Sequence, residues 1–295
     1  MALERLGESH PPRLGVALSG GGARGLAHLG VLKALEGAGF RIDYLAGTSM
    51  GALVAAGYAL GYSPDELAAL AVDLSQRRNL FRIADVALDR GLLRGERLHA
   101  LLVELTHGAT FADLRIPLTI VAVDLESGEE VHFTQGRLAD ALRASISLPG
   151  LLAPLEWEGH RLVDGGLLND LPADVVRQMG ADVVLAVDVS PSGRGASFWH
   201  RLGQTPLLAA TVGGLLAVLG DALDLVMHKH SLYKLRAFPP DFLLRPAIPP
   251  DVSVISGYNR VSELVHIGME SAIPVLPQLH DVLRPSLPLP RLGKE

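Results

Sequence analysis

Ser49 lies at the centre of a G-x-S-x-G pentapeptide, in which Gly47 and Gly51 are the fixed glycines. Residues 41–46 before it are typical of a short strand, and residues 52–60 after it are compatible with a buried helix. A serine on a sharp turn between a strand and a helix is the arrangement of a nucleophile elbow. There the serine lies at a helix N-terminus, where free N–H groups favour developing negative charge. The alternative is a glycine-rich turn that contains a serine by chance.

A run of glycines also follows an apolar, strand-like segment and opens a helical one. Gly20, Gly22 and Gly25 match the dinucleotide fingerprint G-x-G-x-x-G. The acid that should end the next strand is missing, because Asp43 begins that strand and the pentapeptide occupies its end. No Lys-Ser/Thr ending follows the run, so it is not a P-loop. We favour a third interpretation, in which the N–H groups of Gly20, Gly21 and Gly22 stabilise an oxyanion.

A serine nucleophile needs a base, and Asp164 is the best-placed acidic candidate. It ends a short strand-like segment and is followed by Gly165 and Gly166, which let the backbone approach another loop. The carboxyl ends of strands in an α/β sheet collect at one edge, where sites form. We therefore expect Asp164 at the same edge as Ser49. An ordinary Asp-Gly turn is the alternative.

Histidine is the usual base for a serine, and none of the 11 histidines lies in a motif that favours this role. His28 falls within a predicted helix, where a helix-surface or core position is the simpler interpretation. A conventional Ser-Asp-His triad would take its base from a later residue such as His228 or His266. That alternative stays open at this point.

Composition limits the class of protein. The chain has 295 residues, of which 48% are hydrophobic and 20% charged, as expected for a folded protein with a large core. A net charge of −6 and the lack of a basic stripe argue against a nucleic-acid partner. The chain has no cysteine, which excludes disulfides and thiolate metal sites and fits a reducing compartment. We expect neither a cofactor nor a metal ion.

Strand-like and helical segments alternate along the chain, so the predicted fold is α/β, with a mostly parallel central sheet covered by helices on both faces. The predicted strands include residues 13–19, 117–124 and 182–189, and a last helix is expected over residues 261–272. We predict one domain over residues 13–275, with tails at 1–12 and 276–295. The first 12 residues lack the apolar segment of a secretory signal.

Four motifs occur together, in a characteristic order. They are residues 19–25, 47–51, 144–150 and 164–166. In their order and spacing the chain resembles the patatin-like phospholipase family. It looks most like bacterial members that are similar to the catalytic domain of neuropathy target esterase. The resemblance covers about residues 13–189 and implies a patatin-like, three-layer fold.

The resemblance implies a Ser–Asp dyad without a catalytic histidine. Ser49 would attack an ester carbonyl, Asp164 would accept the serine proton, and the glycine loop would supply the oxyanion donors. An aspartate of ordinary pKa is a weak base, so the site must raise the pKa of Asp164, for example by burial. Arg24 and Gly25 are expected to support the loop, and contact of Arg24 with a lipid phosphate is the alternative. Where many members have an aromatic residue, this chain has Leu151, which should alter the pocket shape.

The resemblance therefore implies a lipid acyl hydrolase that acts on phospholipid or lysophospholipid esters. The alternatives are an α/β-hydrolase-type esterase with a triad and a non-catalytic regulatory module of the same fold. The apolar segment from Pro206 to Gly220 is shorter than a membrane-spanning helix. It is predicted to be a core or subunit-contact helix, with a membrane-facing cap as the alternative. The expected location is cytoplasmic, with peripheral contact at the inner membrane as a variant of it.

Overall fold

The computed structural model describes residues 11–76, 85, 93–190, 213–254 and 256–284. Its centre is an eight-stranded sheet of order β5-β6-β3-β2-β1-β7-β8, and β4 pairs with β3 outside this path. The strands are β1 Leu14–Leu18, β2 Tyr44–Thr48, β3 Leu118–Asp124, β4 Glu130–Phe133, β5 Leu155–Trp157, β6 His160–Asp164, β7 Val183–Val187 and β8 Phe242–Leu244. The pairs β3–β4, β3–β6 and β5–β6 are antiparallel and the others are parallel. The prediction of a mostly parallel sheet is confirmed.

Both faces of the sheet are covered. β1 and β3 are buried along their whole lengths, as expected for strands with no face toward water. Leu14, Val16 and Leu18 of β1 belong to a core cluster on one face, whereas Ala17 belongs to a second cluster on the other. This alternation is the period of two along a strand. The fold therefore has three layers, with helices on each side of the sheet.

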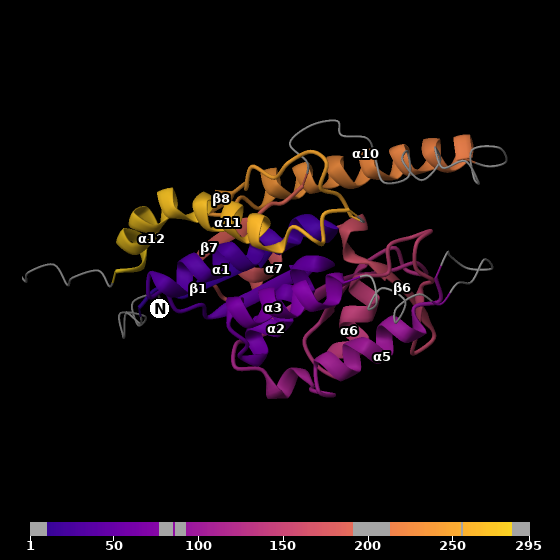
Figure 1. Ribbon diagram of the computed structural model, residues 1–295, viewed down its shortest axis with the longest axis horizontal. Coiled ribbons are helices and arrows are strands. Elements are labelled where there is room, and N and C mark those ends of the chain that lie inside the picture. Colours follow the sequence, from indigo (N-terminus) through magenta and orange to yellow (C-terminus); the bar gives the residue numbers. More distant parts are fainter. Residues whose placement is uncertain (1–10, 77–84, 86–92, 191–212, 255, 285–295) are drawn as a thin grey trace, which may run out of the picture.

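The helices divide between these two faces. The larger core cluster contains residues of α1, α2, α6 and α11, and the smaller one is formed by the sheet, α7 and Leu235 of α10. Figure 1 shows α10 running along one outer side of the molecule, with one end projecting past the rest of the described fold. The helices are α1 Ala27–Gly37, α2 Met50–Leu60, α3 Pro64–Ser75, α5 Glu96–Leu105, α6 Leu138–Ser145, α7 Ala173–Gln178, α10 Gly213–Ala237, α11 Val261–Ala272 and α12 Leu276–Leu283. Short 3-10 turns lie at η1 Gly22–Leu26, η2 Phe111–Asp113, η3 Gly165–Leu167 and η4 Ile273–Val275.

Strand register brings the candidate nucleophile and base to one level of the sheet. Thr48 of β2 pairs with Val121 of β3, so Ser49 follows beside Ala122. Asp164 of β6 also pairs with Ala122, from the other side of β3. The sequence predicted that Asp164 lies near Ser49 because the carboxyl ends of parallel strands share one edge of the sheet. In the structure, β6 instead runs antiparallel to β3. The juxtaposition comes from the register of β6 and not from a parallel direction.

Helical structure continues past residue 275, the predicted end of the domain. Helix α12 lies within the predicted tail 276–295, and Leu279 on it is fully buried in the main core cluster. Pro277 lies in the first turn of α12, where proline is tolerated. Residues 1–10 and 285–295 lie outside the described residues.

The apolar segment predicted as a helix over residues 206–220 also differs. Residues 206–212 lie outside the described residues, and α10 continues from Gly213 to Ala237, well past the predicted end. The leucines, lysines and arginine that follow Gly220 are good helix formers, which is consistent with the longer helix. Within the described chain, no helix combines the length and apolar character needed to cross a bilayer.

Candidate active site

Ser49 occupies the turn between β2 and α2 with φ 53° and ψ −120°. Positive φ is unfavourable for a residue other than glycine and persists where the surroundings hold it in place. A Cβ on Gly51 would lie 2.2 Å from the Leu18 carbonyl oxygen, so α2 approaches β1 at a distance that requires glycine. The Ser49 N–H donates to Ser145 Oγ at 2.9 Å, and Ser145 Oγ donates to the Val121 carbonyl at 2.6 Å. Ser49 is therefore held in a strained, well-supported elbow.

The side chain of Ser49 points to Asp164. Ser49 Oγ donates to Asp164 Oδ2 at 2.7 Å, and the Gly166 N–H donates to Asp164 Oδ1 at 2.8 Å. The Asp164 N–H donates to the Ser147 carbonyl at 3.0 Å, which fixes the backbone of Asp164. One carboxylate oxygen is thus oriented by the backbone, and the other is directed at the serine hydroxyl.

The surroundings of Asp164 make it a stronger base than an exposed aspartate. Its residue exposure is only 4%. Burial raises the pKa of Asp164 to about 6, and the hydrogen bonds from Gly166 and Ser49 oppose this rise. At neutral pH the carboxyl is therefore largely ionised, yet it binds a proton more readily than an ordinary aspartate does. This is the property that a carboxylate base for a hydroxyl needs.

The described histidines do not take the place of a base. His28 is buried, with Nε2 2.8 Å from the Ser19 carbonyl oxygen, and burial lowers the pKa of its ring to about 4. His228 and His266, the candidates for a triad, are both exposed. Among the described residues, no hydrogen bond is recorded between a histidine and Ser49 or Asp164. The geometry therefore favours Asp164 as the proton acceptor.

The glycine loop lies beside Ser49, since a Cβ on Gly20 would be 3.3 Å from Ser49 Cβ. Of the three predicted oxyanion donors, the Gly20 N–H donates to the Asp170 carbonyl at 3.1 Å. Within the described chain, no acceptor is recorded for the N–H groups of Gly21 and Gly22. The candidate donors are therefore these two groups.

The far side of the loop is held by residues 252–254. Gly22 has φ 58°, and a Cβ there would lie 2.3 Å from Val254 Cα, so the position requires glycine. The Ala23 N–H donates to the Ser253 carbonyl at 3.2 Å, and Arg24 Nε donates to the Val252 carbonyl at 3.1 Å. These contacts give Arg24 a place in supporting the loop, as expected. Gly25, also predicted to support it, is buried in η1.

Asp170 is a neighbour of the dyad whose place the sequence did not reveal. A Cβ on Gly20 would lie 2.4 Å from Asp170 Oδ1. A Cβ on Gly166 would lie 3.2 Å from both Asp170 Oδ1 and Asp164 Oδ1, so the two carboxyl groups approach the same glycine. Burial and the negative charges of Asp188 and Asp164 raise the pKa of Asp170 to about 7. Its closeness in sequence to Gly165 and Gly166 was the available signal.

Asn169 and Asp170 do not cap the helix that follows them. The residue before α7 is Pro172, and no side chain accepts from the first N–H groups of this helix. Asn169 Nδ2 instead donates to Asp174 Oδ1 and Glu130 Oε2, both at 2.9 Å. Asn169 and Asp170 lie too far before the helix to cap it, so they serve tertiary contacts.

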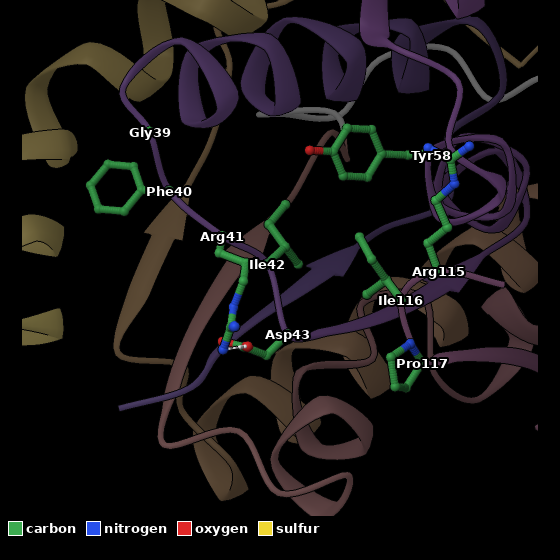
Figure 2. Close-up of a pocket in the computed structure, with 9 residues that line it drawn as sticks. All are labelled: Gly39, Phe40, Arg41, Ile42, Asp43, Tyr58, Arg115, Ile116 and Pro117. Carbon is green, nitrogen blue, oxygen red and sulfur yellow. Dashed lines mark ion pairs between the residues drawn. The ribbon is translucent and has the colours of Figure 1, made fainter. Parts of the chain in front are cut away.

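A hollow lies at the opposite, amino edge of the sheet (Figure 2). Its volume is about 580 Å³, and Ile42, Tyr58 and Ile116 lie around it. Arg41 Nη2 pairs with Asp43 Oδ1 at 2.6 Å on its rim. Neither Ser49 nor Asp164 lines this hollow. Within the described residues, no three His, Asp or Glu side chains converge as a metal site.

Comparison with known proteins gives results that agree with this geometry. The family model described as patatin-like phospholipase matches residues 16–177, which include Ser49 and Asp164. An uncharacterized NTE family protein of Mycobacterium tuberculosis is 41% identical over 192 residues, covering 65% of this chain and 53% of the relative. Another from the same organism is 36% identical over 281 residues, covering 92% of this chain and 48% of the relative.

Two further similarities extend this result. Patatin-like phospholipase domain-containing protein 6 of Mus musculus is 35% identical over 183 residues, which is 60% of this chain and 13% of that protein. The crystal structure of VipD from Legionella pneumophila shares the fold, with a TM-score of 0.51 and 16% identity over 91% of this chain and 67% of that one. The chain spans about half the length of the mycobacterial relatives that it matches.

Proposed function

Because the chain belongs to the patatin-like phospholipase family, we propose that it hydrolyses carboxylic esters of phospholipids or lysophospholipids. The observation that carries the proposal is the 2.7 Å hydrogen bond from Ser49 Oγ to the buried carboxyl of Asp164. The strained elbow at Ser49 and the glycine loop beside it support the same interpretation. These parts together supply a nucleophile, a base and oxyanion donors.

The first half of the reaction acylates the enzyme. Ser49 Oγ attacks the ester carbonyl carbon while its proton passes to Asp164 Oδ2. The carbonyl oxygen becomes an oxyanion beside the N–H groups of Gly21 and Gly22, and an oxyanion donor is worth a few kcal/mol in the transition state. The carbon–oxygen bond to the leaving alcohol then breaks, and Asp164 returns its proton to that alcohol. The acyl group remains as an ester of Ser49.

The second half releases the fatty acid. Water attacks the acyl carbonyl and transfers a proton to Asp164, with the second oxyanion in the same place as the first. The bond to Ser49 Oγ breaks, and the serine recovers its proton from Asp164. A pKa of about 6 suits both steps, because Asp164 must accept and return a proton near neutral pH.

Two alternatives make different predictions. In an esterase with a Ser-Asp-His triad, substitution of His228 or His266 abolishes activity, although both side chains are exposed. In a non-catalytic module of the same fold, Ser49 is unreactive, and its strained conformation then has no chemical purpose. The expected location, cytoplasmic and peripheral to a membrane, stays a prediction.

The test is a screen of lipid classes with the wild-type chain, using Ser49→Ala as the blank. We expect release of fatty acid from phospholipid or lysophospholipid esters, and none above background from Ser49→Ala. Neutral acylglycerols in the same screen show whether a phosphate head group is needed. Equal hydrolysis by both proteins, or none of any ester, would contradict the proposal.

A further inference from the structure

The long helix α10 has an inward side that is fixed by contacts with the rest of the fold. A Cβ on Gly166 would lie 3.0 Å from Met227 Cε, so Met227 covers the loop that follows Asp164. Lys234 Nζ pairs with Glu130 Oε1 at 2.6 Å and with Asp174 Oδ2 at 2.7 Å. Because these contacts set the rotation of the helix, they also determine which side faces outward.

The outward side carries large apolar side chains. Leu225 is 59% exposed, Val226 is 62% exposed and Tyr233 is 65% exposed. Their spacing of one and eight residues places them on one side of an α-helix. Val218, one to two turns earlier, is 66% exposed and extends the same side. An open hollow of about 420 Å³ lies among Leu225, Val226, Lys229, His230 and Tyr233. We call Val218, Leu225, Val226, Lys229, Tyr233 and Arg236 the outer face of α10.

The charge of this part of the helix is opposite to that of the chain. Residues 225–237 of α10 contain Lys229, Lys234 and Arg236, two histidines and no acidic residue, although Asp221 and Asp224 precede them in the helix, whereas the chain as a whole has a net charge of −6. Lys234 is used in the inward ion pairs, but Lys229 and Arg236 are exposed on the outer face. A helix that presents apolar and basic side chains together is typical of binding at an anionic lipid surface.

We propose that the outer face of α10 docks on the surface of an anionic lipid bilayer. Leu225, Val226 and Tyr233 would enter the interfacial region, and Lys229 and Arg236 would lie at the level of the lipid phosphates. This face lies further along the chain than residues 206–220, for which a membrane-facing cap was the alternative interpretation. The inference deepens the proposed function and rests on it for its purpose, because Met227 joins this helix to the loop beside Asp164. Docking brings the bilayer next to the site that takes lipid esters.

The experiment is vesicle co-sedimentation with ether-linked lipids, which cannot be hydrolysed at an ester bond. Vesicles of phosphatidylcholine alone are compared with vesicles that also contain phosphatidylglycerol. We expect binding to the anionic vesicles only. The double variant Leu225→Glu/Val226→Glu should bind at least about tenfold more weakly, because two exposed apolar groups are lost. Lys229→Gln/Arg236→Gln should lose about fivefold for each charge removed, and added salt should weaken wild-type binding.

A matched control separates docking from a general effect of charge. Val72 on α3 is 46% exposed, so Val72→Glu adds an acid to another exposed valine outside α10 and should leave binding unchanged. All variants should hydrolyse a water-soluble short-chain ester at the wild-type rate, because none of the altered residues lies in the dyad or the glycine loop.

Three outcomes would overturn the docking proposal. They are no wild-type binding to anionic vesicles, equal binding by the α10 variants, and a change of oligomeric state in those variants without any effect on vesicles. The last result would make the outer face a contact between copies of this chain. If wild type binds vesicles but hydrolyses no ester, the docking stands and the proposed function fails.

Discussion

The two edges of the sheet differ in a way that separates a hollow from a chemical site. At the amino edge, Asp43 pairs with Arg41 at 2.6 Å and accepts the Leu14 N–H at 2.9 Å, beside the hollow of about 580 Å³. At the other edge, Asp164 is buried without a recorded cation among the described residues, and accepts from Ser49 Oγ and a backbone N–H. The first carboxylate is neutralised by an arginine. The second is desolvated and aimed at a nucleophile, which is what catalysis requires.

Backbone strain also differs between the two edges of the sheet. Ser49 has positive φ although it is not glycine, and it lies at the catalytic edge. At the amino edge the positive φ in the hollow belongs to Gly39, which adopts it without cost. The presence of a hollow therefore does not locate the chemistry of this fold. Backbone strain at the nucleophile and a desolvated carboxyl locate that chemistry. The following predictions test this difference between the two edges.

The largest expected effect distinguishes the two aspartates. Asp164→Asn removes the proton acceptor of Ser49 while nearly preserving its shape, so kcat/KM for ester hydrolysis should fall by about 10³-fold or more. Asp43→Asn makes the same chemical change at the amino edge and should alter kcat/KM by less than about twofold. Both variants are measured with the same soluble ester. Similar effects of the two substitutions on kcat/KM would contradict a catalytic role that belongs to Asp164 alone.

The second prediction compares two glycines of positive φ. Gly22→Ala places a Cβ 2.3 Å from Val254 Cα and disturbs the oxyanion loop, so kcat should fall by about 10²-fold. Gly39→Ala also has positive φ, 78°, but nothing lies within 4 Å of its added Cβ. It should cost about 1 kcal/mol of stability and leave kcat unchanged. Thermal unfolding and kcat are measured for both, and a Gly22→Ala protein that is folded and fully active would contradict the role of the loop.

The third prediction concerns stability and pH. Asp164 has a pKa of about 6 in the fold against an ordinary 3.8, so between these values the folded chain holds a proton that the unfolded chain releases. The free energy of unfolding therefore falls as the pH rises through this window, by up to about 3 kcal/mol. Asp164→Asn removes that loss, so its stability relative to wild type should increase from about pH 4 to about pH 8. Denaturant unfolding at both pH values checks this.

Using the change between two pH values cancels the contacts that the substitution itself removes. Asp43→Asn is measured alongside as the same substitution at the amino edge of the sheet, away from the dyad. A relative stability of Asp164→Asn that is constant or falls with pH would contradict the view that ionised Asp164 is held at a cost.

The smallest expected effect concerns Asp170. For wild type, kcat/KM with an uncharged ester should rise with pH through about 6 as Asp164 ionises. It should then decline above about 7, because an ionised Asp170 adds negative charge beside the oxyanion loop. Three groups surround Asp170. Asp164 approaches it at Gly166, and the Ser190 hydroxyl donates to it at 3.2 Å. Asp188, which pairs with Arg245, adds a nearby negative charge. Asp170→Asn should abolish the decline, so that its kcat/KM at alkaline pH is a few-fold higher than that of wild type. The rise of kcat/KM through about pH 6 should remain. An unchanged alkaline limb would exclude this influence.

Much of the fold could be predicted because its signals are local. The apolar runs of β1, β3 and β7 lie in consecutive residues, and the structure has strands there. The elbow around Ser49 was predictable for the same reason, because strand, turn and helix are contiguous. The strand-end argument placed Asp164 at the edge of Ser49, and the family resemblance implied their pairing, but the antiparallel direction of β6 was not foreseen.

The parts that could not be predicted depend on contacts between distant segments. The Gly20 N–H is used by the Asp170 carbonyl, and no local pattern indicates such a partner. Asn169 Nδ2 donates to Glu130, which lies on β4 and 39 residues away in the chain. The exposed outer face of α10 is likewise visible only after the inward contacts of Met227 and Lys234 are known.

The most direct test of the account is the rate at which a fluorophosphonate labels Ser49, with the labelled residue identified by mass spectrometry. We expect a single label on Ser49, formed at least about 100-fold more slowly in Asp164→Asn and at an unchanged rate in His228→Ala and His266→Ala. A label on another residue, an undiminished rate in Asp164→Asn, or loss of labelling in either histidine variant would contradict a Ser49–Asp164 dyad.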